Sequence, residues 1–429
     1  MNTLINRAAI AFAVLAIAVA VVHTGGGPSV VLKVDGLANA NVSVAARDRF
    51  VSVVWAAVAE GGSTDIYTAM SRDGGATFGS PLRVNDLPGD AHVSGEQPPR
   101  IVLVPRANGD PSVVVVWTSS RTDGTRLLTA HSDDGARTFS RAALVPGGEA
   151  SGNRGWESAI VDAAGHVDVM WLDHRDMTHA ATSARQASGA SDHTPHDGVA
   201  MAQQSQLFVS SLDSAVSPHA VTRGVCYCCK TAMAAGPDDS LYVAWRHVYP
   251  GNVRDIAFSM SQDGGRTFAV PIRVSDDRWV LDGCPENGPA LAVDSNRRIH
   301  IVWPTLLPAP APDSEATLGL FYAMSDDGRQ FTRRQRIPTE GVPRHPQMAI
   351  DGRGHVFAAW DEQLNGTRHV ALGRTTVDGS GNIRMQRVSV KDDMPGVYPA
   401  LAGLPQGAVA AWVGGSSGAF VIRVERLFN

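Results

Sequence analysis

Seven of the nine tryptophans in this 429-residue chain each end a short apolar run, and they recur at nearly even intervals. They are Trp55, Trp117, Trp171, Trp245, Trp303, Trp360 and Trp412, which stand 62, 54, 74, 58, 57 and 52 residues apart. The apolar runs are short and bounded by Gly, Pro, Asn or Asp, a pattern typical of strands rather than helices. The spacing therefore predicts an all-β protein, a β-propeller of seven blades with about four strands each.

A propeller must close its ring, because an open sheet edge invites aggregation. The segment Val30–Val34 has the pattern of an outermost strand but precedes the first complete repeat. We expect this N-terminal strand to complete the last blade beside Phe420–Val424 and so to close the ring. One propeller domain is thus predicted over residues 28–429, with an insertion at about 177–204 that accounts for the longest spacing.

The N-terminus has the features of an export signal. Arg7 precedes an apolar run from Ala8 to Val22, whose 15 residues are short for a membrane-spanning helix and typical of a signal peptide. We expect a signal peptide over residues 1–24 and an exported protein, periplasmic or extracellular; an uncleaved membrane anchor is the alternative. The chain has 37 basic and 42 acidic side chains, a net charge of −5, which argues against a nucleic-acid partner. A monomer is expected.

A second motif recurs in register with the tryptophans. Ser71–Phe78 is repeated at Ser132–Phe139 and Ser261–Phe268, and Ser325–Phe331 is a version one residue shorter. In each copy Asp can accept hydrogen bonds from backbone N–H groups, Gly can take a positive φ, and Phe can pack between sheets. The motif therefore predicts a tight turn, which we expect on the face opposite any functional site.

These motifs resemble the Asp boxes, or BNR repeats, of the sialidase superfamily. The resemblance implies a propeller over nearly all of the mature chain and, for an enzyme, a glycoside hydrolase of exo-sialidase type. Enzymatic sialidases have six blades, so six is the alternative to seven. Asp boxes also occur in propellers without catalytic activity, so the motif predicts fold more strongly than function.

Polar side chains gather where the first strand of each repeat begins and just after the tryptophans, positions that converge around the channel on one face. Sialidase chemistry uses arginines to bind the substrate carboxylate, with a tyrosine, a glutamate and an aspartate for catalysis. The resemblance assigns Arg100, Arg246, Asp123 and Tyr398 to such roles. The full set of acid–base or nucleophile candidates is Tyr398, Asp173, Glu157, Asp361 and Asp123. The candidates for ligand binding are Arg100, Arg246, Arg344, Arg175 and His247.

The match to the family is incomplete. Cys228-Cys229-Lys230 stands where the resemblance places a glutamate, and no arginine occurs over Ser314–Leu318, where a third is expected. The leading prediction is therefore a protein that binds an anionic glycan-like ligand at the channel mouth, with binding favoured over hydrolysis. The alternatives are a metal-binding or redox protein and a non-enzymatic interaction scaffold.

All four cysteines of the chain open two neighbouring repeats. They are Cys226, Cys228, Cys229 and Cys284. In an oxidising compartment they predict two disulfides, or one disulfide and a free pair, with Cys284 bonded to one of the other three. The alternative is a soft-metal site for Cu(I) or Zn(II), with His174 or His247 as a nearby imidazole. The glycan prediction itself requires no cofactor.

The insertion carries further polar side chains that metals can bind. These are His179, Asp192, His193, His196 and Asp197. For such a loop a solvated lid is favoured over a ligand role.

Overall fold

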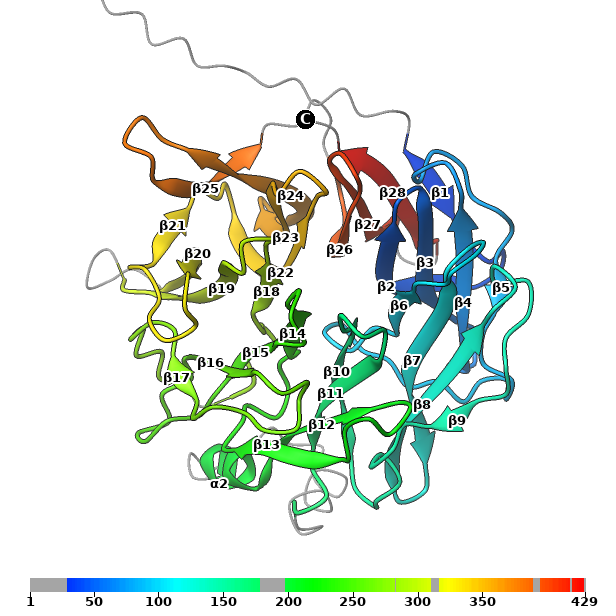
Figure 1. The fold of residues 1–429 in the computed structure, drawn as a ribbon, viewed down its shortest axis with the longest axis horizontal. Coiled ribbons are helices and arrows are strands. Elements are labelled where there is room, and N and C mark those ends of the chain that lie inside the picture. The colour runs from blue at the N-terminus through cyan, green and yellow to red at the C-terminus, as the bar shows by residue number, and fades with distance from the viewer. Residues whose placement is uncertain are drawn as a thin grey trace, which may run out of the picture.

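The computed structural model of the protein describes residues 29–177, 197–281, 283–309, 316–388, 394–416 and 419–427. They form seven four-stranded antiparallel sheets, arranged as blades around one central axis (Figure 1). This confirms the seven-bladed propeller, and the six-bladed alternative is wrong. The expected signal peptide over residues 1–24 lies outside the described residues, as do residues 178–196 of the insertion. Within the described ranges, no helix is both long enough and apolar enough to cross a membrane.

The blades are numbered in chain order. The innermost strands of blades 1 to 7 are β2 (Ala38–Arg47), β6 (Arg100–Val104), β10 (Arg154–Val161), β14 (Ala232–Ala235), β18 (Ala290–Val293), β22 (Val342–Ile350) and β26 (Val397–Gly403). The second strands are β3 (Phe50–Val58), β7 (Ser112–Arg121), β11 (Val167–Asp173), β15 (Leu241–Arg246), β19 (Ile299–Leu307), β23 (Val356–Leu364) and β27 (Ala408–Gly414). The third strands are β4 (Thr64–Ser71), β8 (Gly124–Ser132), β12 (Gln206–Ser211), β16 (Ile256–Ser261), β20 (Thr317–Ser325), β24 (Thr367–Val377) and β28 (Val421–Leu427). The outermost strands are β5 (Leu82–Arg83), β9 (Ala143–Leu144), β13 (His219–Arg223), β17 (Ile272–Arg273), β21 (Gln335–Ile337), β25 (Ile383–Val388) and β1 (Val30–Leu32). Helix α2 (Asp197–Gln204) precedes β12.

The tryptophan repeat is a packing repeat. Each of the seven lies on a second strand and is at most 2% exposed. Each belongs to a different one of the apolar clusters that fill the spaces between neighbouring blades. Trp55 of blade 1, for example, shares its cluster with Val424 of blade 7. Because burying a large apolar side chain contributes about 1.5–3 kcal/mol, one tryptophan per interface accounts for the regular spacing.

The Ser–Asp–Gly motifs form tight turns, as predicted. In the first copy, Asp73 Oδ1 accepts hydrogen bonds from the backbone nitrogens of Ala76 and Thr77, both at 2.9 Å. The backbone nitrogen of Gly74, which has a φ of 75°, donates to the carbonyl of Arg49 at 2.8 Å. Arg49 lies in the turn between β2 and β3, so this motif sits at the end of the blade opposite the start of its innermost strand.

The N-terminal strand closes the ring, which confirms a second prediction. Strand β1 pairs antiparallel with β28, with Val30 opposite Val424 and Leu32 opposite Ile422. Leu32 is 6% exposed and belongs to the apolar cluster between blades 7 and 1. The last blade is therefore built from both ends of the described chain.

This closure can be tested by shortening the Leu32 side chain. We expect Leu32→Ala to lower the free energy of unfolding by about 2 kcal/mol, because it removes buried methyl groups and leaves a cavity. The matched control is Val31→Ala on the same strand, whose side chain is 47% exposed and should matter little. Urea unfolding monitored by tryptophan fluorescence measures both. Equal loss from the two variants would contradict a closing role for the buried face of β1.

Candidate functional site

Four innermost strands are bulged near their first residues. The pairing register shifts there in β2, β10, β22 and β26, and the bulged residues are Asn41, Trp156, His345 and Tyr398. Their φ angles are 53°, 54°, 52° and 51°, a left-handed conformation that residues other than glycine seldom adopt. A bulge changes the direction of a side chain, and such backbone strain is typical of functional sites. These four strained residues therefore indicate a candidate functional site near the starts of the innermost strands, around the central axis.

Three of these residues line one pocket. This mouth pocket is lined by Asn41, Val42, Gly95, Glu96, Pro98, Lys230, His345, Gln347, Tyr398 and Pro399. Its walls come from blades 1, 6 and 7, from the segment before blade 2 and from the segment before blade 4. The lining combines two acid–base side chains, a cation, a carboxylate and two amides, a set that can hydrogen-bond to a polar group presented at the pocket.

His345 and Tyr398 form the acid–base part of the mouth pocket. His345 Nδ1 lies 2.7 Å from Asp361 Oδ1, and Asp361 is fully buried. The same oxygen accepts a hydrogen bond from the backbone nitrogen of Tyr398 at 3.2 Å, while Asp361 Oδ2 forms an ion pair with Arg368 Nη2 at 2.8 Å. The rings of His345 and Tyr398 are 4.1 Å apart between centroids. With Nδ1 held by a carboxylate, Nε2 is the nitrogen that a ligand can use.

Burial raises the pKa of Tyr398, so its phenol is neutral near pH 7 and can donate a proton. Arg344 directly precedes His345 on β22 and is half-buried. Within the described part of the chain no ion pair or hydrogen bond engages its guanidinium. Arg344 is therefore a cation that a ligand carboxylate could pair with.

Glu96 lines the mouth pocket and binds backbone groups that belong to other blades. Its carboxylate accepts hydrogen bonds from the backbone nitrogens of Lys230, at 3.0 Å, and Gly288, at 3.0 and 3.1 Å. Lys230 and Gly288 lie in the segments that precede blades 4 and 5, whereas Glu96 lies in the segment that precedes blade 2. A Cβ at Gly288 would lie 2.1 Å from the Lys230 carbonyl oxygen, so only glycine permits this approach.

Lys230 is a buried cation beside this carboxylate. Its Nζ donates to the carbonyl of Pro289, and burial lowers its pKa to about 8 even though Glu96 favours the charged form. The side chain therefore remains mostly protonated at neutral pH. Lys230 thus brings positive charge to the lining of the mouth pocket, whereas Arg344 is not a lining residue but directly precedes one, His345.

Arg100 and Glu157 lie on adjacent innermost strands, β6 and β10. Arg100 Nε donates to the Glu157 carbonyl oxygen at 2.6 Å. Glu157 is 1% exposed, and burial raises its pKa to about 7 despite the charge of Arg100. Neither Arg100 Nη2 nor Glu157 Oε1 has a hydrogen-bond partner among the described residues. A carboxyl group with this pKa can serve as a general acid at neutral pH.

The guanidinium of Arg246 is hydrogen-bonded to backbone carbonyl groups. Its guanidinium donates to the carbonyl oxygens of Arg254 at 2.6 Å, Asn287 at 2.8 and 3.1 Å, and Pro304 at 2.8 Å. It is 1% exposed and lies over the ring of Trp279, 4.6 Å from its centroid. These contacts connect blade 4 to blade 5, so the geometry gives Arg246 a structural task rather than a ligand contact.

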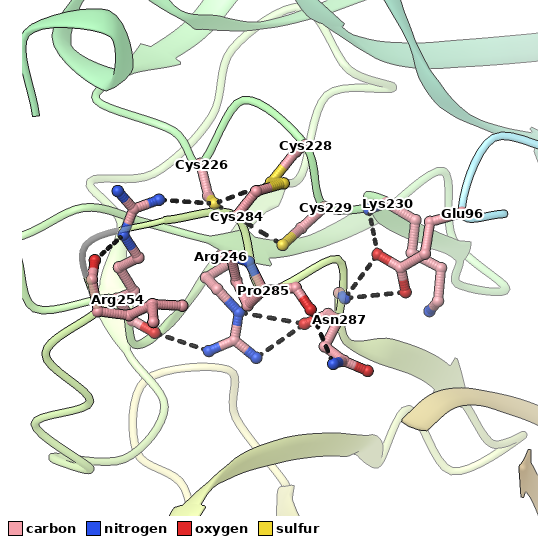
Figure 2. Close-up of a disulfide and its surroundings, with 12 residues drawn as sticks. Glu96, Cys226, Cys228, Cys229, Lys230, Arg246, Arg254, Cys284, Pro285 and Asn287 are labelled. Carbon is pink, nitrogen blue, oxygen red and sulfur yellow. Dashed lines mark hydrogen bonds between the residues drawn. A yellow bond between two sulfur atoms is a disulfide. The ribbon is translucent and has the colours of Figure 1, made fainter. Parts of the chain in front are cut away.

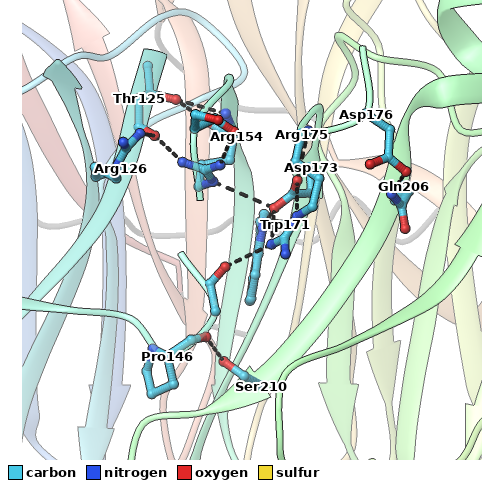
Figure 3. A network of polar contacts seen from close by, with 12 residues as sticks. Thr125, Arg126, Pro146, Arg154, Trp171, Asp173, Arg175, Asp176, Gln206 and Ser210 are labelled. Atoms are coloured by element: carbon cyan, nitrogen blue, oxygen red, sulfur yellow. Dashed lines mark hydrogen bonds and ion pairs between the residues drawn. The ribbon is translucent and has the colours of Figure 1, made fainter. Parts of the chain in front are cut away.

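Asp173 and Arg175 belong to a second buried network, shown in Figure 3. Asp173 accepts hydrogen bonds from Trp171 Nε1 and from Arg175 Nε and Nη2, each at 2.8 Å, and Arg154 Nε is 3.5 Å from its Oδ2. Burial alone would raise the pKa of Asp173, but the hydrogen bonds from Arg175 and Trp171 and the charge of Arg154 hold it below its usual value. Every oxygen of this carboxylate is thus engaged inside blade 3.

The remaining predicted residues lie outside the mouth pocket. Asp123 is exposed and pairs with Arg126 at 2.6 Å. His247 is half-buried beside Tyr249, and burial lowers its pKa to about 4. His174 is buried against Trp156, with 5.6 Å between ring centroids. None of the three lines the mouth pocket.

Of the predicted acid–base residues, the structure places Tyr398 in the mouth pocket and Asp361 directly behind it. His345 and Lys230 were not predicted as site residues, although each directly follows one that was, Arg344 and Cys229. Asn41 and Glu96 carry no such signal. Their roles depend on partners far along the chain: Glu96 is 134 and 192 residues from the groups it binds.

The cysteines form one compact group beside the mouth pocket (Figure 2). Cys228 and Cys284 form a disulfide, while Cys226 and Cys229 are unbonded and buried. This is one of the two predicted arrangements, one disulfide and a free pair; the other, two disulfides, is not observed. A hydrogen bond from Cys229 and the charges of Arg254 and Arg246 lower the pKa of Cys226 to about 6 despite its burial. Burial and the neighbouring Cys226 raise the pKa of Cys229.

No family model matches the sequence, and no curated protein matches it. Among solved structures, an ulvan lyase of polysaccharide lyase family PL25 is similar with a TM-score of 0.57 and 10% identity, over 94% of this chain and 96% of that one. The GH93 alpha-L-arabinofuranosidase of Fusarium graminearum gives 0.52 and 12%, over 94% and 98%. A puromycin-hydrolyzing peptidase of Mycobacterium tuberculosis gives 0.50 and 13%, over 96% of this chain and 57% of that one. At these identities the similarity shows the fold alone, a propeller shared by carbohydrate-active enzymes and a peptidase.

Proposed function

We propose that the protein binds a carboxylated glycan across the opening of the mouth pocket and that His345 and Tyr398 serve as the acid–base pair for cleaving a glycosidic bond of that glycan. The observation that carries this proposal is the geometry of His345, held through Nδ1 by the buried Asp361 at 2.7 Å and in ring contact with Tyr398 at 4.1 Å between centroids. A strained backbone at both ring-bearing residues supports a functional rather than a packing role.

The chemistry of bond cleavage needs one group that accepts a proton and one that donates it. His345 Nε2 can accept a proton, because the contact between Nδ1 and Asp361 Oδ1 favours the tautomer in which Nδ1 carries the hydrogen. The Tyr398 phenol is neutral near pH 7 and can donate to a leaving oxygen. The adjacent rings therefore supply both functions in one pocket.

The charge of the site supports an anionic ligand. Lys230 is a cation in the lining of the pocket, and Arg344 directly precedes the lining residue His345 on β22. A guanidinium can bind a carboxylate through two parallel hydrogen bonds. The fold is shared with an ulvan lyase and an arabinofuranosidase, which supports a carbohydrate as the ligand. The Cys228–Cys284 disulfide and the predicted signal peptide support export to a compartment outside the cytosol. Carboxylated glycans would be available to the protein there.

Binding and turnover can be separated with two substitutions. We expect Arg344→Ala to weaken binding of uronic-acid oligosaccharides or sialosides at least about tenfold, since it removes the cation that pairs with the carboxylate. His345→Gln should bind nearly as tightly as the wild type but release no reducing ends, since glutamine cannot exchange a proton. Isothermal titration calorimetry measures the first result and a reducing-end assay the second.

Arg72→Ala is the matched control, because Arg72 lies in the tight turn at the far end of blade 1 and pairs with Asp110 at 2.6 Å. It should change neither binding nor turnover. The proposal fails if wild-type protein binds neither class of glycan, or if Arg344→Ala and Arg72→Ala bind alike.

A further inference from the structure

The four cysteines bring four sulfur atoms to one point that the proposed glycan site does not use (Figure 2). Cys226 Sγ lies 3.8 Å from Cys228 Sγ and 3.7 Å from Cys229 Sγ, and these three atoms are all within 4.8 Å of one another. Cys284 Sγ is bonded to Cys228 Sγ. We propose that, once the Cys228–Cys284 disulfide is reduced, the four thiolates bind one zinc ion.

The sulfur positions suit a tetrahedral zinc site. With Zn–S bonds of about 2.3 Å, the edges of a regular tetrahedron of sulfurs are about 3.8 Å long. The two separations measured from Cys226 match this edge. The Cα atoms of Cys228 and Cys284 are 6.1 Å apart, so rotation of the two side chains can separate their sulfurs without moving the backbone. A closed set of four sulfurs in this geometry is typical of structural zinc.

The charges around the cluster also fit. Four thiolates and one Zn²⁺ carry a net charge of about −2, which a buried site must neutralise. Arg254 is fully buried and its Nη1 donates to Cys226 Sγ at 3.2 Å. The backbone nitrogen of Cys226 donates to the carbonyl of Arg246, whose buried guanidinium is the second cation. Arg254 Nη2 has no hydrogen-bond partner among the residues that the structure describes.

The fold gives this site a defined mechanical task. Cys226, Cys228 and Cys229 lie in the segment that leads into β14, and Cys284 lies in the segment that leads into β18. A zinc ion bound to all four would therefore join the inner edges of blades 4 and 5. Lys230 follows Cys229 directly and lines the mouth pocket, so the same ion would hold one wall of that pocket.

Reduction can begin at Cys284, which is exposed, whereas the other three cysteines are buried. A thiolate of a dithiol reductant attacks Cys284 Sγ, which forms a mixed disulfide and releases Cys228 as a thiolate. The second thiol of the reductant then displaces Cys284 as a thiolate, and the reductant leaves as a disulfide after giving up two electrons. Zinc binding expels the remaining thiol protons to solvent.

The test uses full-length protein in two redox states. One sample stays air-oxidised, and the other is reduced with dithiothreitol and desalted without oxygen. Denatured and chelated aliquots should titrate two thiols before reduction and four after it. Zinc is then added in competition with a chromophoric chelator. We expect about one zinc ion per chain in the reduced protein and none in the oxidised protein.

Three variants make the result specific. Cys226→Ser and Cys284→Ser should each weaken zinc binding by more than about 100-fold, beyond the cost of losing an outer-shell partner. Cys226→Ser keeps the disulfide, so far-UV circular dichroism of its oxidised form checks the fold independently. Tyr227→Phe is the matched control within the same segment and should bind like the wild type. Cobalt(II) in place of zinc should give the sulfur-to-metal absorption of a tetrahedral thiolate site.

Two outcomes would overturn the proposal: reduced wild-type protein that takes up no zinc, or serine variants that bind zinc as the wild type does. Uptake of Cu(I) without Zn(II) would overturn the zinc assignment. The measurement is independent of any glycan, so the zinc proposal and the proposed function can fail separately.

Discussion

Asp173→Ala should lower the free energy of unfolding by about 3–5 kcal/mol, because it leaves a buried guanidinium without its counter-charge. Arg154 is 1% exposed and has Asp173 as its carboxylate neighbour at 3.5 Å, inside blade 3. The substitution also removes the acceptor of the Trp171 indole and of Arg175. Urea denaturation at neutral pH, monitored by far-UV circular dichroism, measures the loss.

Two further variants define the cause of that loss. Asp173→Asn keeps the shape and part of the hydrogen bonding, so it should cost less than alanine. Asp123→Ala removes an exposed carboxylate from a surface pair with Arg126, and it should cause no measurable change. A stable Asp173→Ala protein that has lost glycan cleavage would contradict the structural role and favour the catalytic one.

Glu157→Gln should make the protein more stable at about pH 8, by up to about 3 kcal/mol, and leave its stability unchanged near pH 4. Burial raises the pKa of Glu157 from 4.5 to about 7. Between these values the unfolded chain has lost a proton that the folded protein keeps, so stability falls as the pH rises through this window. Glutamine has the shape of the protonated acid but does not titrate, so the variant does not lose this part of its stability as the pH rises.

The difference between the variant and the wild type isolates this group. Asp168 is also buried, and burial raises its pKa to about 7. It therefore also lowers the free energy of unfolding as the pH rises, but by the same amount in the wild type and in Glu157→Gln. Glu149→Gln, at an exposed position before β10, is the control and should follow the wild-type curve at every pH. If Glu157→Gln also follows that curve, the carboxyl group is not held in its protonated form by the fold.

The architecture was predictable because its signals are local. Each blade repeats one tryptophan that fills the space to the next blade, and this packing requirement recurs at each interface. The tight turns follow from hydrogen bonds within a few residues, as between Asp73 and Thr77. Closure by Val30–Leu32 followed from one unpaired strand pattern at the N-terminus.

The site was predictable only in part, because a residue type at a strand end does not reveal its partners. Arg246 and Arg344 were both predicted as ligand-binding residues from their places at strand ends, yet the guanidinium of Arg246 is hydrogen-bonded to carbonyl groups. Arg344 has no such partners among the described residues. The same contrast separates Asp173, enclosed in blade 3, from Asp361, which positions His345 beside the mouth pocket.

The sequence by itself predicted seven blades and the closing strand, because periodicity is a property of the linear chain. For the cysteines it left two arrangements open, two disulfides or one disulfide and a free pair. Only the tertiary structure decided which side chains share the mouth pocket and which sulfurs are bonded. Glu96 meets backbone nitrogens 134 and 192 residues away, and the bulges that direct Asn41, His345 and Tyr398 are backbone features that no residue pattern specifies. Contacts across the ring arise only when all seven blades have closed, so no local signal encodes them.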